Sequence, residues 1–151
     1  MNNDIIIRQA SEADFDTLVE FRLAMFREMG WTDEPRLDEL APRYLAYLRE
    51  HFSAGDFRAW VAERDGAILG GVGLLWQRVP PTVRNLSGRQ AYVLGLYVRP
   101  EDRRRGVARL LVDAAIASAR EGDAAVIALH TSEHGRALYE RLGFVDSPEM
   151  R

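Results

Sequence analysis

A strand, an arginine-rich turn and a helix follow one another directly in the second half of this sequence. Residues 90–98 (QAYVLGLYV) have the apolar, β-branched and aromatic pattern of a buried strand, and apolar residues recur at helical spacing from Val107 onward. The helix is expected to end near Gly122, and a second strand pattern covers residues 124–129. A strand–helix–strand unit needs a right-handed crossover, which makes its two strands parallel neighbours in one sheet.

The first half of the chain predicts mostly antiparallel pairing. Asp65-Gly66 lies between two strand patterns and is a strong signal for a two-residue hairpin turn. Pro42 falls inside a helical pattern, so that helix is expected to be kinked, split or late in starting. The tail from Phe144 is expected to add only a short strand. The remaining expected elements are strands at residues 5–7, 57–63 and 67–76, helices at about 12–29, 37–52 and 133–142, and a loop at 77–89. The order predicts a single domain over residues 1–151, of the α+β class with a mixed α/β sheet.

Composition excludes several classes of protein. The chain has no cysteine, which excludes a disulfide framework, a thiolate nucleophile and cysteine zinc sites. A formal net charge of -3 gives no global reason to expect nucleic-acid binding. No segment approaches the roughly 18 apolar residues of a membrane span, and the N-terminus lacks the pattern of a signal peptide. We therefore expect a cytoplasmic enzyme or binding domain, with no membrane or nucleic-acid partner.

The turn before the central helix has the features of an anion site. Arg103, Arg104, Arg105 and Gly106 immediately precede the helix. A helix start presents free N–H groups and a partial positive charge, and glycine lets a phosphate approach the backbone. A pyrophosphate would fit, although a solvated basic turn would give the same pattern. No Gly-Lys-Ser/Thr follows, which excludes a Walker-type loop, and the dinucleotide fingerprint is also absent.

The last helix carries one candidate acid and one misleading motif. Tyr139 is the ionisable aromatic residue of this helix, and its phenol could donate a proton or simply pack in the core. His130, Glu133 and His134 match H-x-x-E-H, an inverted zinc-peptidase pattern. That pattern needs one continuous helix, whereas residues 124–129 read as a strand that runs directly into His130. We expect the turn to separate the two histidines and predict no metal site.

Two motifs together resemble the GNAT superfamily of N-acetyltransferases. The coenzyme A motif of that family is Arg or Gln, two residues, Gly, one residue, and Gly or Ala, and it is matched from Arg103 to Ala108. The family's closing pattern is matched by Ala137, Leu138-Tyr139 and Gly143-Phe144. The resemblance covers nearly the whole chain in element order. It implies a three-layer fold whose central, mostly antiparallel sheet is flanked by helices and contains two splayed parallel strands.

The resemblance also implies a reaction and a set of roles. Acetyl-CoA would be the co-substrate, with its pantetheine arm in the gap between the splayed strands and Gly95 hosting the distortion that opens it. Tyr139 would protonate the departing thiolate while a primary amine attacks directly, without a covalent enzyme intermediate. Relatives often have Asn where this chain has His134, and the side chain of that Asn contacts coenzyme A. In this chain His134 would take the place of Asn in that contact. The implied cofactor-binding residues are Leu96, Tyr97, Val98, Arg103, Arg104, Arg105, Gly106, Val107, Ala108, Arg109 and His134.

Several questions stay open at the level of sequence. No general base stands out, and Glu28 and Glu63 are the candidates. The acceptor region offers Glu28, Asp33 and Glu34 for a cation, and Arg22, Arg27 and Arg78 for a carboxylate. The short tail suggests an uncovered sheet edge and hence a possible homodimer. Two other functions are a catalytically silent acetyl-CoA-binding regulator and a zinc-dependent hydrolase.

Overall fold

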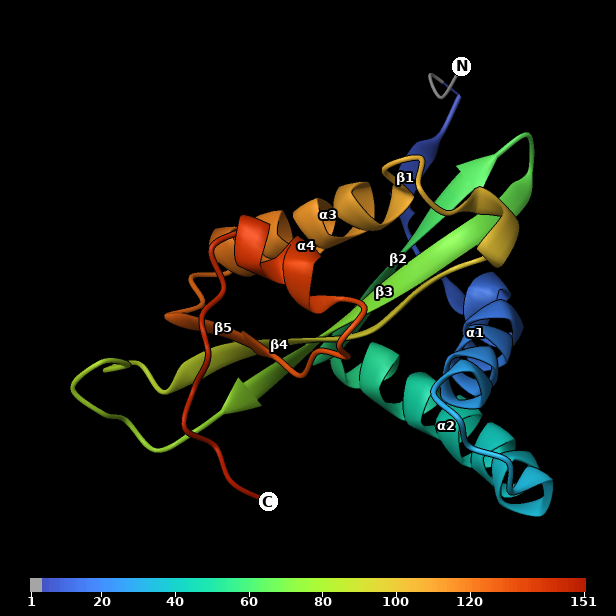
Figure 1. The fold of residues 1–151 in the computed structure, drawn as a ribbon. Coiled ribbons are helices and arrows are strands. Elements are labelled where there is room, and N and C mark those ends of the chain that lie inside the picture. The colour runs from blue at the N-terminus through green and yellow to red at the C-terminus, as the bar shows by residue number, and fades with distance from the viewer. Residues whose placement is uncertain (1–3) are drawn as a thin grey trace.

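A single five-stranded sheet organises the computed structural model, which describes residues 4–151. The strands lie in chain order, with three antiparallel pairings followed by one parallel pairing between β4 and β5. Helices α1 and α2 cover one face of the sheet and α3 covers the other, which gives three layers (Figure 1). The expected mixed, mostly antiparallel sheet is therefore confirmed. The elements are β1 (Ile6–Gln9), α1 (Phe15–Glu28), α2 (Glu34–Ala54), β2 (Phe57–Arg64), β3 (Ala67–Arg78), β4 (Arg89–Val98), α3 (Val107–Glu121), β5 (Val126–Leu129) and α4 (Arg136–Arg141), with 3₁₀ turns at Glu12–Asp14 and Pro100–Asp102.

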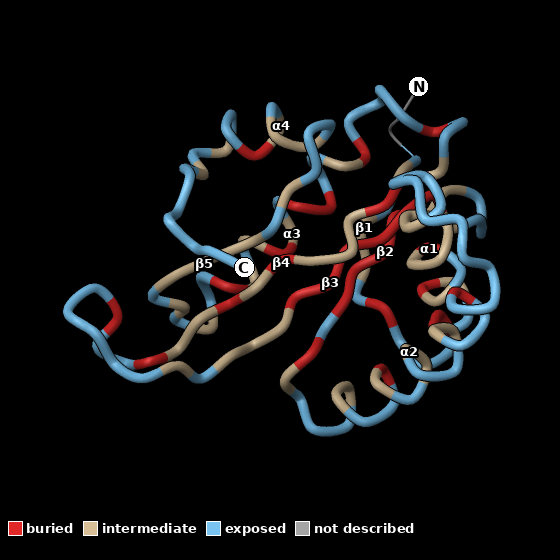
Figure 2. The backbone as a smooth tube through the Cα atoms, turned by 60° about the horizontal axis from the view of Figure 1, so that its bottom comes forward, coloured by how far each residue is buried: buried red, intermediate tan, exposed pale blue. Residues whose placement is uncertain are grey.

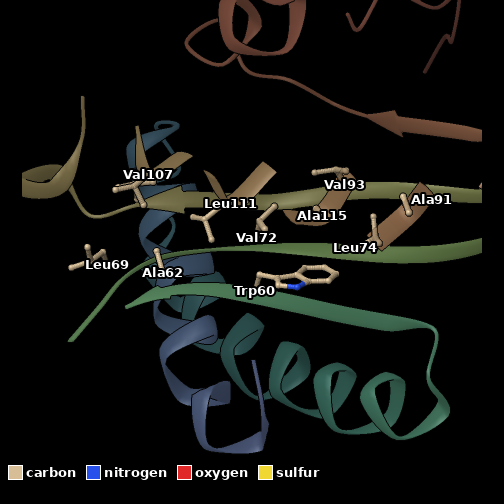
Figure 3. Packing of buried hydrophobic residues seen from close by; sticks show 12 residues of the cluster. Trp60, Ala62, Leu69, Val72, Leu74, Ala91, Val93, Val107, Leu111 and Ala115 are labelled. Atoms are coloured by element: carbon tan, nitrogen blue, oxygen red, sulfur yellow. The ribbon is translucent and has the colours of Figure 1, made fainter. Parts of the chain in front are cut away.

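Each face of the sheet has its own apolar core. On one face, Val107, Leu111 and Ala115 of α3 pack on β2, β3 and β4, where Val72 and Leu74 are fully buried (Figure 3). On the other face, α1 and α2 enclose a second cluster that includes the ring of Phe57. Buried positions accordingly concentrate along the central strands, while the outer faces of the helices are exposed (Figure 2). The alternation of side chains along β4 decides which residues meet α1 and α2 and which meet α3.

The glycines of β3 mark close backbone approaches, as the sequence indicated. A Cβ added at Gly70 would lie 2.5 Å from the carbonyl oxygen of Tyr97, and one at Gly73 would lie 2.6 Å from Cζ of Phe57. Larger side chains at these positions would push β3 away from β4 or from the core. The hairpin turn at Asp65-Gly66 is also confirmed, because both residues have the positive φ of a type I′ turn, 51° and 79°.

Three expectations about the helices and the tail require correction. Helix α2 runs through Pro42 without interruption, so it is neither split nor late, and the kink stays a prediction. One missing N–H costs a single backbone bond, and the burial of Leu37 and Leu48 keeps the helix in place. Helix α4 begins at Arg136 rather than near residue 133, and residues 144–151 add no strand. Among residues 4–151, no helix has both the length and the apolarity needed to cross a membrane.

Candidate active site

The parallel pair opens partway along β4. Residues 90–93 of β4 pair with residues 126–129 of β5, and the pairing then stops at Val93–Leu129. Strand β4 continues to Val98, paired with β3, and beyond Val93 no strand among residues 4–151 pairs with its other edge. Those residues of 94–98 whose backbone groups point away from β3 therefore face the opening between the two strands, where the carbonyl oxygen of Val98 accepts from Arg103. An extended chain with amide groups could bind there by adding to the sheet edge.

A bulge at Gly95 accompanies this opening. Between the pairs Gly71–Tyr97 and Gly73–Leu94, β3 advances by two residues and β4 by three. The additional residue is accommodated where Gly95 has a φ of +67°, a conformation that glycine adopts at little cost. The expectation that Gly95 hosts the strand distortion is thereby confirmed. The bulge lies two residues beyond the last β4–β5 pair, which is where the strands begin to separate.

The turn that leads into α3 leaves an open approach to the helix start. Gly106 is the N-cap of α3, with a φ of +81° and no side chain capping the first turn. A Cβ added at Gly106 would meet no atom within 4 Å, so the space beside it is free. Arg104 also has a positive φ, +63°. Free N–H groups, the helix dipole and this open space are the features that a phosphate-binding helix start requires.

The side chain of Arg103 has a structural task at this turn. Its Nε donates to the carbonyl oxygen of Val98 at 2.8 Å, and its Nη2 donates to both carboxylate oxygens of Glu28, at 2.8 and 3.0 Å. Its guanidinium also lies over the ring of Tyr97. Arg103 thus ties the turn to the end of β4 and to α1, and a phosphate would meet its backbone more readily than its side chain. Arg109 pairs with Asp113 on the exposed side of α3, and the side chain of Arg104 is exposed.

The two carboxylates considered as bases are both held by arginines. Glu28 forms an ion pair with Arg103. Burial raises the pKa of its carboxyl group, but hydrogen bonds from Arg103 and Tyr97 outweigh burial and hold that pKa below the ordinary value. Glu63 lies on β2, separated from the opening by β3, and pairs with Arg8 at 3.3 Å. Glu28 lies beside the end of β4 through Arg103 and Tyr97, with its carboxylate already bound, and Glu63 lies away from the opening.

Tyr139 is almost fully buried on α4, with 8% of its surface exposed. Its ring packs edge-on against Phe144, at 5.8 Å between centroids, and burial raises the pKa of the phenol to about 12. Among residues 4–151, its hydroxyl has no hydrogen-bond partner. The hydroxyl is therefore protonated at neutral pH and available to a ligand.

The H-x-x-E-H residues do not share a helix. His130 directly follows β5, and Glu133 and His134 lie exposed in the turn before α4. No group of three or more histidine, aspartate or glutamate residues within positions 4–151 has the arrangement of a metal site. The turn separates the histidines as expected, so the geometry that the zinc-hydrolase motif requires is not formed.

Two features of this region could not be read from the sequence. His130 contacts the hydroxyl of Tyr92 through Nδ1, and Glu149 through Nε2 at 3.2 Å, so residues of the tail lie beside the opening. The guanidinium of Arg22 lies next to Gly95. For the contacts of His130, the sequence signal was limited to its position at the end of a strand. For Arg22, the sequence indicated only that it is one of three arginines near the acceptor region.

The fold and the site define the class of this protein before any comparison does. A mixed sheet whose parallel pair opens beside a glycine turn at a helix start is the arrangement that the GNAT resemblance predicted. Residues 19–144 match the acetyltransferase (GNAT) family. The chain belongs to that family.

Individual relatives agree with this assignment. The crystal structure of a GCN5-related N-acetyltransferase from Ralstonia eutropha JMP134 is similar over 97% of this chain and 96% of its own, with 32% identity and a TM-score of 0.91. A predicted acetyltransferase from Clostridium acetobutylicum, crystallised with acetyl-CoA, is similar over 97% and 94%, with 25% identity and a TM-score of 0.87. The mouse probable N-acetyltransferase family 8 member 5 is 34% identical over 102 residues, which are 66% of this chain and 41% of that protein. The chain thus spans less than half the length of that mouse relative.

Proposed function

We propose that this protein transfers the acetyl group of acetyl-CoA directly to a primary amine of a small molecule or peptide. The observation that carries the proposal is the unpaired edge of β4 at residues 94–98, which leads straight to the open helix start at Gly106. One extended molecule with amide groups at one end and a pyrophosphate at the other matches both features. The similar Clostridium acetobutylicum structure with acetyl-CoA supports this co-substrate.

Each part of the co-substrate has a proposed partner. The backbone of Leu96, Tyr97 and Val98 would bind the pantetheine amides along the open edge of β4. Backbone N–H groups of residues 104–109 would hold the pyrophosphate, with charge supplied by the exposed Arg104. The exposed imidazole of His134 would donate to coenzyme A where relatives use Asn. Arg103 would position this turn through Val98 and Glu28.

The reaction is an exchange of one bond and one proton. The amine nitrogen attacks the thioester carbonyl carbon, a C–N bond forms, and the C–S bond breaks. The nitrogen loses a proton and the sulfur gains one, which gives an amide and free coenzyme A. A backbone N–H of β4 would stabilise the carbonyl oxygen as negative charge develops on it.

The raised pKa of Tyr139 limits how this residue acts. A thiol has an ordinary pKa of about 8.5, so full transfer from a phenol of pKa about 12 is unfavourable by roughly 5 kcal/mol. Hydrogen bonding from the phenol to the developing thiolate needs no such transfer and still stabilises the charge. We therefore assign Tyr139 as the donor to the leaving sulfur, with the final proton drawn from water.

The competing function is a silent acetyl-CoA-binding regulator. The deciding experiment incubates the purified protein with acetyl-CoA and pooled amines, and measures free coenzyme A together with the mass of the products. An N-acetylated product formed with stoichiometric coenzyme A is the expected result. Acetyl-CoA binding with no product across a broad panel of amines would favour the regulator, and absence of acetyl-CoA binding would refute both functions. The expected cytoplasmic location is a separate prediction, tested by cell fractionation.

A further inference from the structure

The guanidinium of Arg22 lies on the α1/α2 face of the sheet, beside the bulge of β4. A Cβ added at Gly95 would be 3.6 Å from Nη1 of Arg22. The pairing of β4 with β5 ends two residues earlier, at Val93. The charge of Arg22 is therefore adjacent to the place where the parallel strands separate. Arg22 belongs to the face of the sheet on which Leu94 packs, opposite to α3.

Two aromatic rings hold this guanidinium in place. Its Cζ lies 5.2 Å from the ring centroid of Phe26 and 4.9 Å from that of Tyr44. Phe26 is one helical turn away on α1, and Tyr44 reaches across from α2. Cation–π contacts of this kind fix the orientation of a guanidinium while leaving its N–H groups without acceptors.

The polar atoms of Arg22 have no acceptor within the described part of the chain. Its Nε is fully buried and makes no hydrogen bond, and Arg22 takes part in no ion pair among residues 4–151. A buried charged donor without a partner is costly, and proteins usually satisfy such groups. Several other arginines of this chain do have carboxylate partners, among them Arg8, Arg27, Arg64 and Arg103. Arg103 also lies over a ring, but its N–H groups have a carboxylate acceptor, whereas those of Arg22 have none among the described residues.

A small cavity accompanies the side chain. It has a volume of about 10 Å³ and lies between α1, α2 and the β3–β4 pair, with Arg22, Tyr44 and Gly95 in its wall. This volume is about that of one water molecule, so a larger ligand has to bind at the mouth of the cavity. A planar ligand with two oxygen acceptors could reach the N–H edge of the guanidinium from there, because the ring contacts occupy other directions.

We propose that Arg22 binds the carboxylate of the acceptor, so that the amines acetylated by this protein are those that also carry a carboxylate, such as amino acids. The proposal rests on the proposed acetyltransferase function and narrows its substrate class. A planar carboxylate matches the fork of N–H groups in a guanidinium and accepts two hydrogen bonds. With the carboxylate at Arg22, an amine a few atoms away on the same molecule lies at the opening between β4 and β5, where the thioester is expected.

The test compares matched acceptors that differ only in the carboxylate. The pairs are phenylalanine with phenethylamine, leucine with isoamylamine, and lysine with cadaverine. For each pair, kcat/KM is measured at saturating acetyl-CoA for the parent, Arg22→Met, Arg22→Lys and Arg27→Met. Arg27 is the matched control, since it lies on the same helix and pairs with Glu34 on the exposed surface. The readout is the ratio of kcat/KM within a pair, because this ratio is insensitive to the fraction of folded protein.

The parent is expected to prefer the amino acid of at least one pair by tenfold or more. Arg22→Met should lower that ratio by about tenfold to a hundredfold, in the range of a lost charged hydrogen bond. Arg22→Lys should give an intermediate ratio because it keeps the charge and loses the fork, and Arg27→Met should match the parent. An unchanged ratio in Arg22→Met, or a parent that prefers the decarboxylated amines, would overturn the proposal.

A binding measurement separates this proposal from the proposed function. Calorimetry of each amino acid with the protein saturated in coenzyme A requires no turnover. Binding by the parent and its loss in Arg22→Met would support the carboxylate site even for a protein that acetylates nothing. Turnover of amines that lack a carboxylate, without binding of any amino acid, would leave the acetyltransferase function intact and refute the role of Arg22.

Discussion

Replacing Gly106 by valine should remove acetyl-CoA binding while the protein stays folded. No atom lies within 4 Å of a Cβ at this position, so the new Cβ makes no close contact with the rest of the protein. Its cost to the fold is backbone strain, because Gly106 has φ +81° and ψ 7°. An L-residue in this left-handed region costs roughly 1–2 kcal/mol, which lowers the Tm of a domain of this size by about 2–8 °C. A bound pyrophosphate, however, would need the space that the valine fills.

Gly55, at the C-terminus of α2, provides a matched control. It has φ +83° and ψ 7°, and a Cβ there also meets no atom within 4 Å. Gly55→Val therefore carries the same strain as Gly106→Val at a position far along the chain from the coenzyme motif. Any difference between the two variants in ligand binding then reports the location of the change rather than its strain.

The assay is thermal unfolding with and without acetyl-CoA. At 100 times its Kd, the ligand adds about 2.7 kcal/mol, which corresponds to roughly 5–11 °C. The parent and Gly55→Val should both show this shift. At the same ligand concentration, a Kd weakened a hundredfold leaves about 0.4 kcal/mol, so Gly106→Val should shift by about 2 °C or less. A full shift in Gly106→Val would show that this turn does not hold the phosphate, and a lost shift in Gly55→Val would show that strain is responsible.

Three further predictions concern Tyr139, its titration and the assembly of the protein. Tyr139→Phe should lower kcat by roughly tenfold to a few hundredfold, the loss expected when a hydrogen bond to the developing thiolate is removed, and leave acetyl-CoA affinity nearly unchanged; a parental kcat at every pH would make Tyr139 a packing residue only. Because the folded protein favours the neutral phenol, with a pKa of about 12 against about 10 when unfolded, its contribution to stability is complete below pH 10 and is lost up to pH 12. The free energy of unfolding of the parent should thus fall by about 3 kcal/mol more than that of Tyr139→Phe across this interval, and parallel curves from urea titrations would contradict the burial effect. The unpartnered outer edge of β5 predicts a homodimer, which light scattering at micromolar protein should detect as twice the chain mass; a monomer mass would refute it.

The local features of this fold were predictable because they depend on neighbouring residues. The β4 strand follows from an apolar run, and the start of α3 follows from a glycine before a helical pattern. Gly95 stood out as the one residue in that run able to host a bulge. The GNAT resemblance then assigned these pieces to a cofactor, and the open edge of β4 has the geometry that this assignment requires.

Features that depend on partners distant in sequence were not predictable in the same way. Arg103 reads as a phosphate ligand, yet its guanidinium binds Glu28, which is 75 residues away. The environment of Arg22 depends on how α2 packs on α1, since Tyr44 comes from the second helix. Pro42 indicates a disturbed helix because helix propensity reflects only the hydrogen bond that proline loses. It does not include the burial of Leu48 in the next turns, which stabilises the helix. In each case tertiary packing selected one of several outcomes that the local sequence allowed.

The split partnership of β4 has a consequence for the hydrogen exchange of its amides. Up to Val93 the strand has a neighbour on both edges, so its amides should exchange with solvent only when the sheet opens. From residue 94 to residue 98, the amides that point toward β5 have no strand to bond with and should exchange from the folded state. A molecule bound along this edge would slow the exchange of these amides selectively. The boundary between slowly and rapidly exchanging amides within β4 would therefore mark the start of the ligand-binding edge.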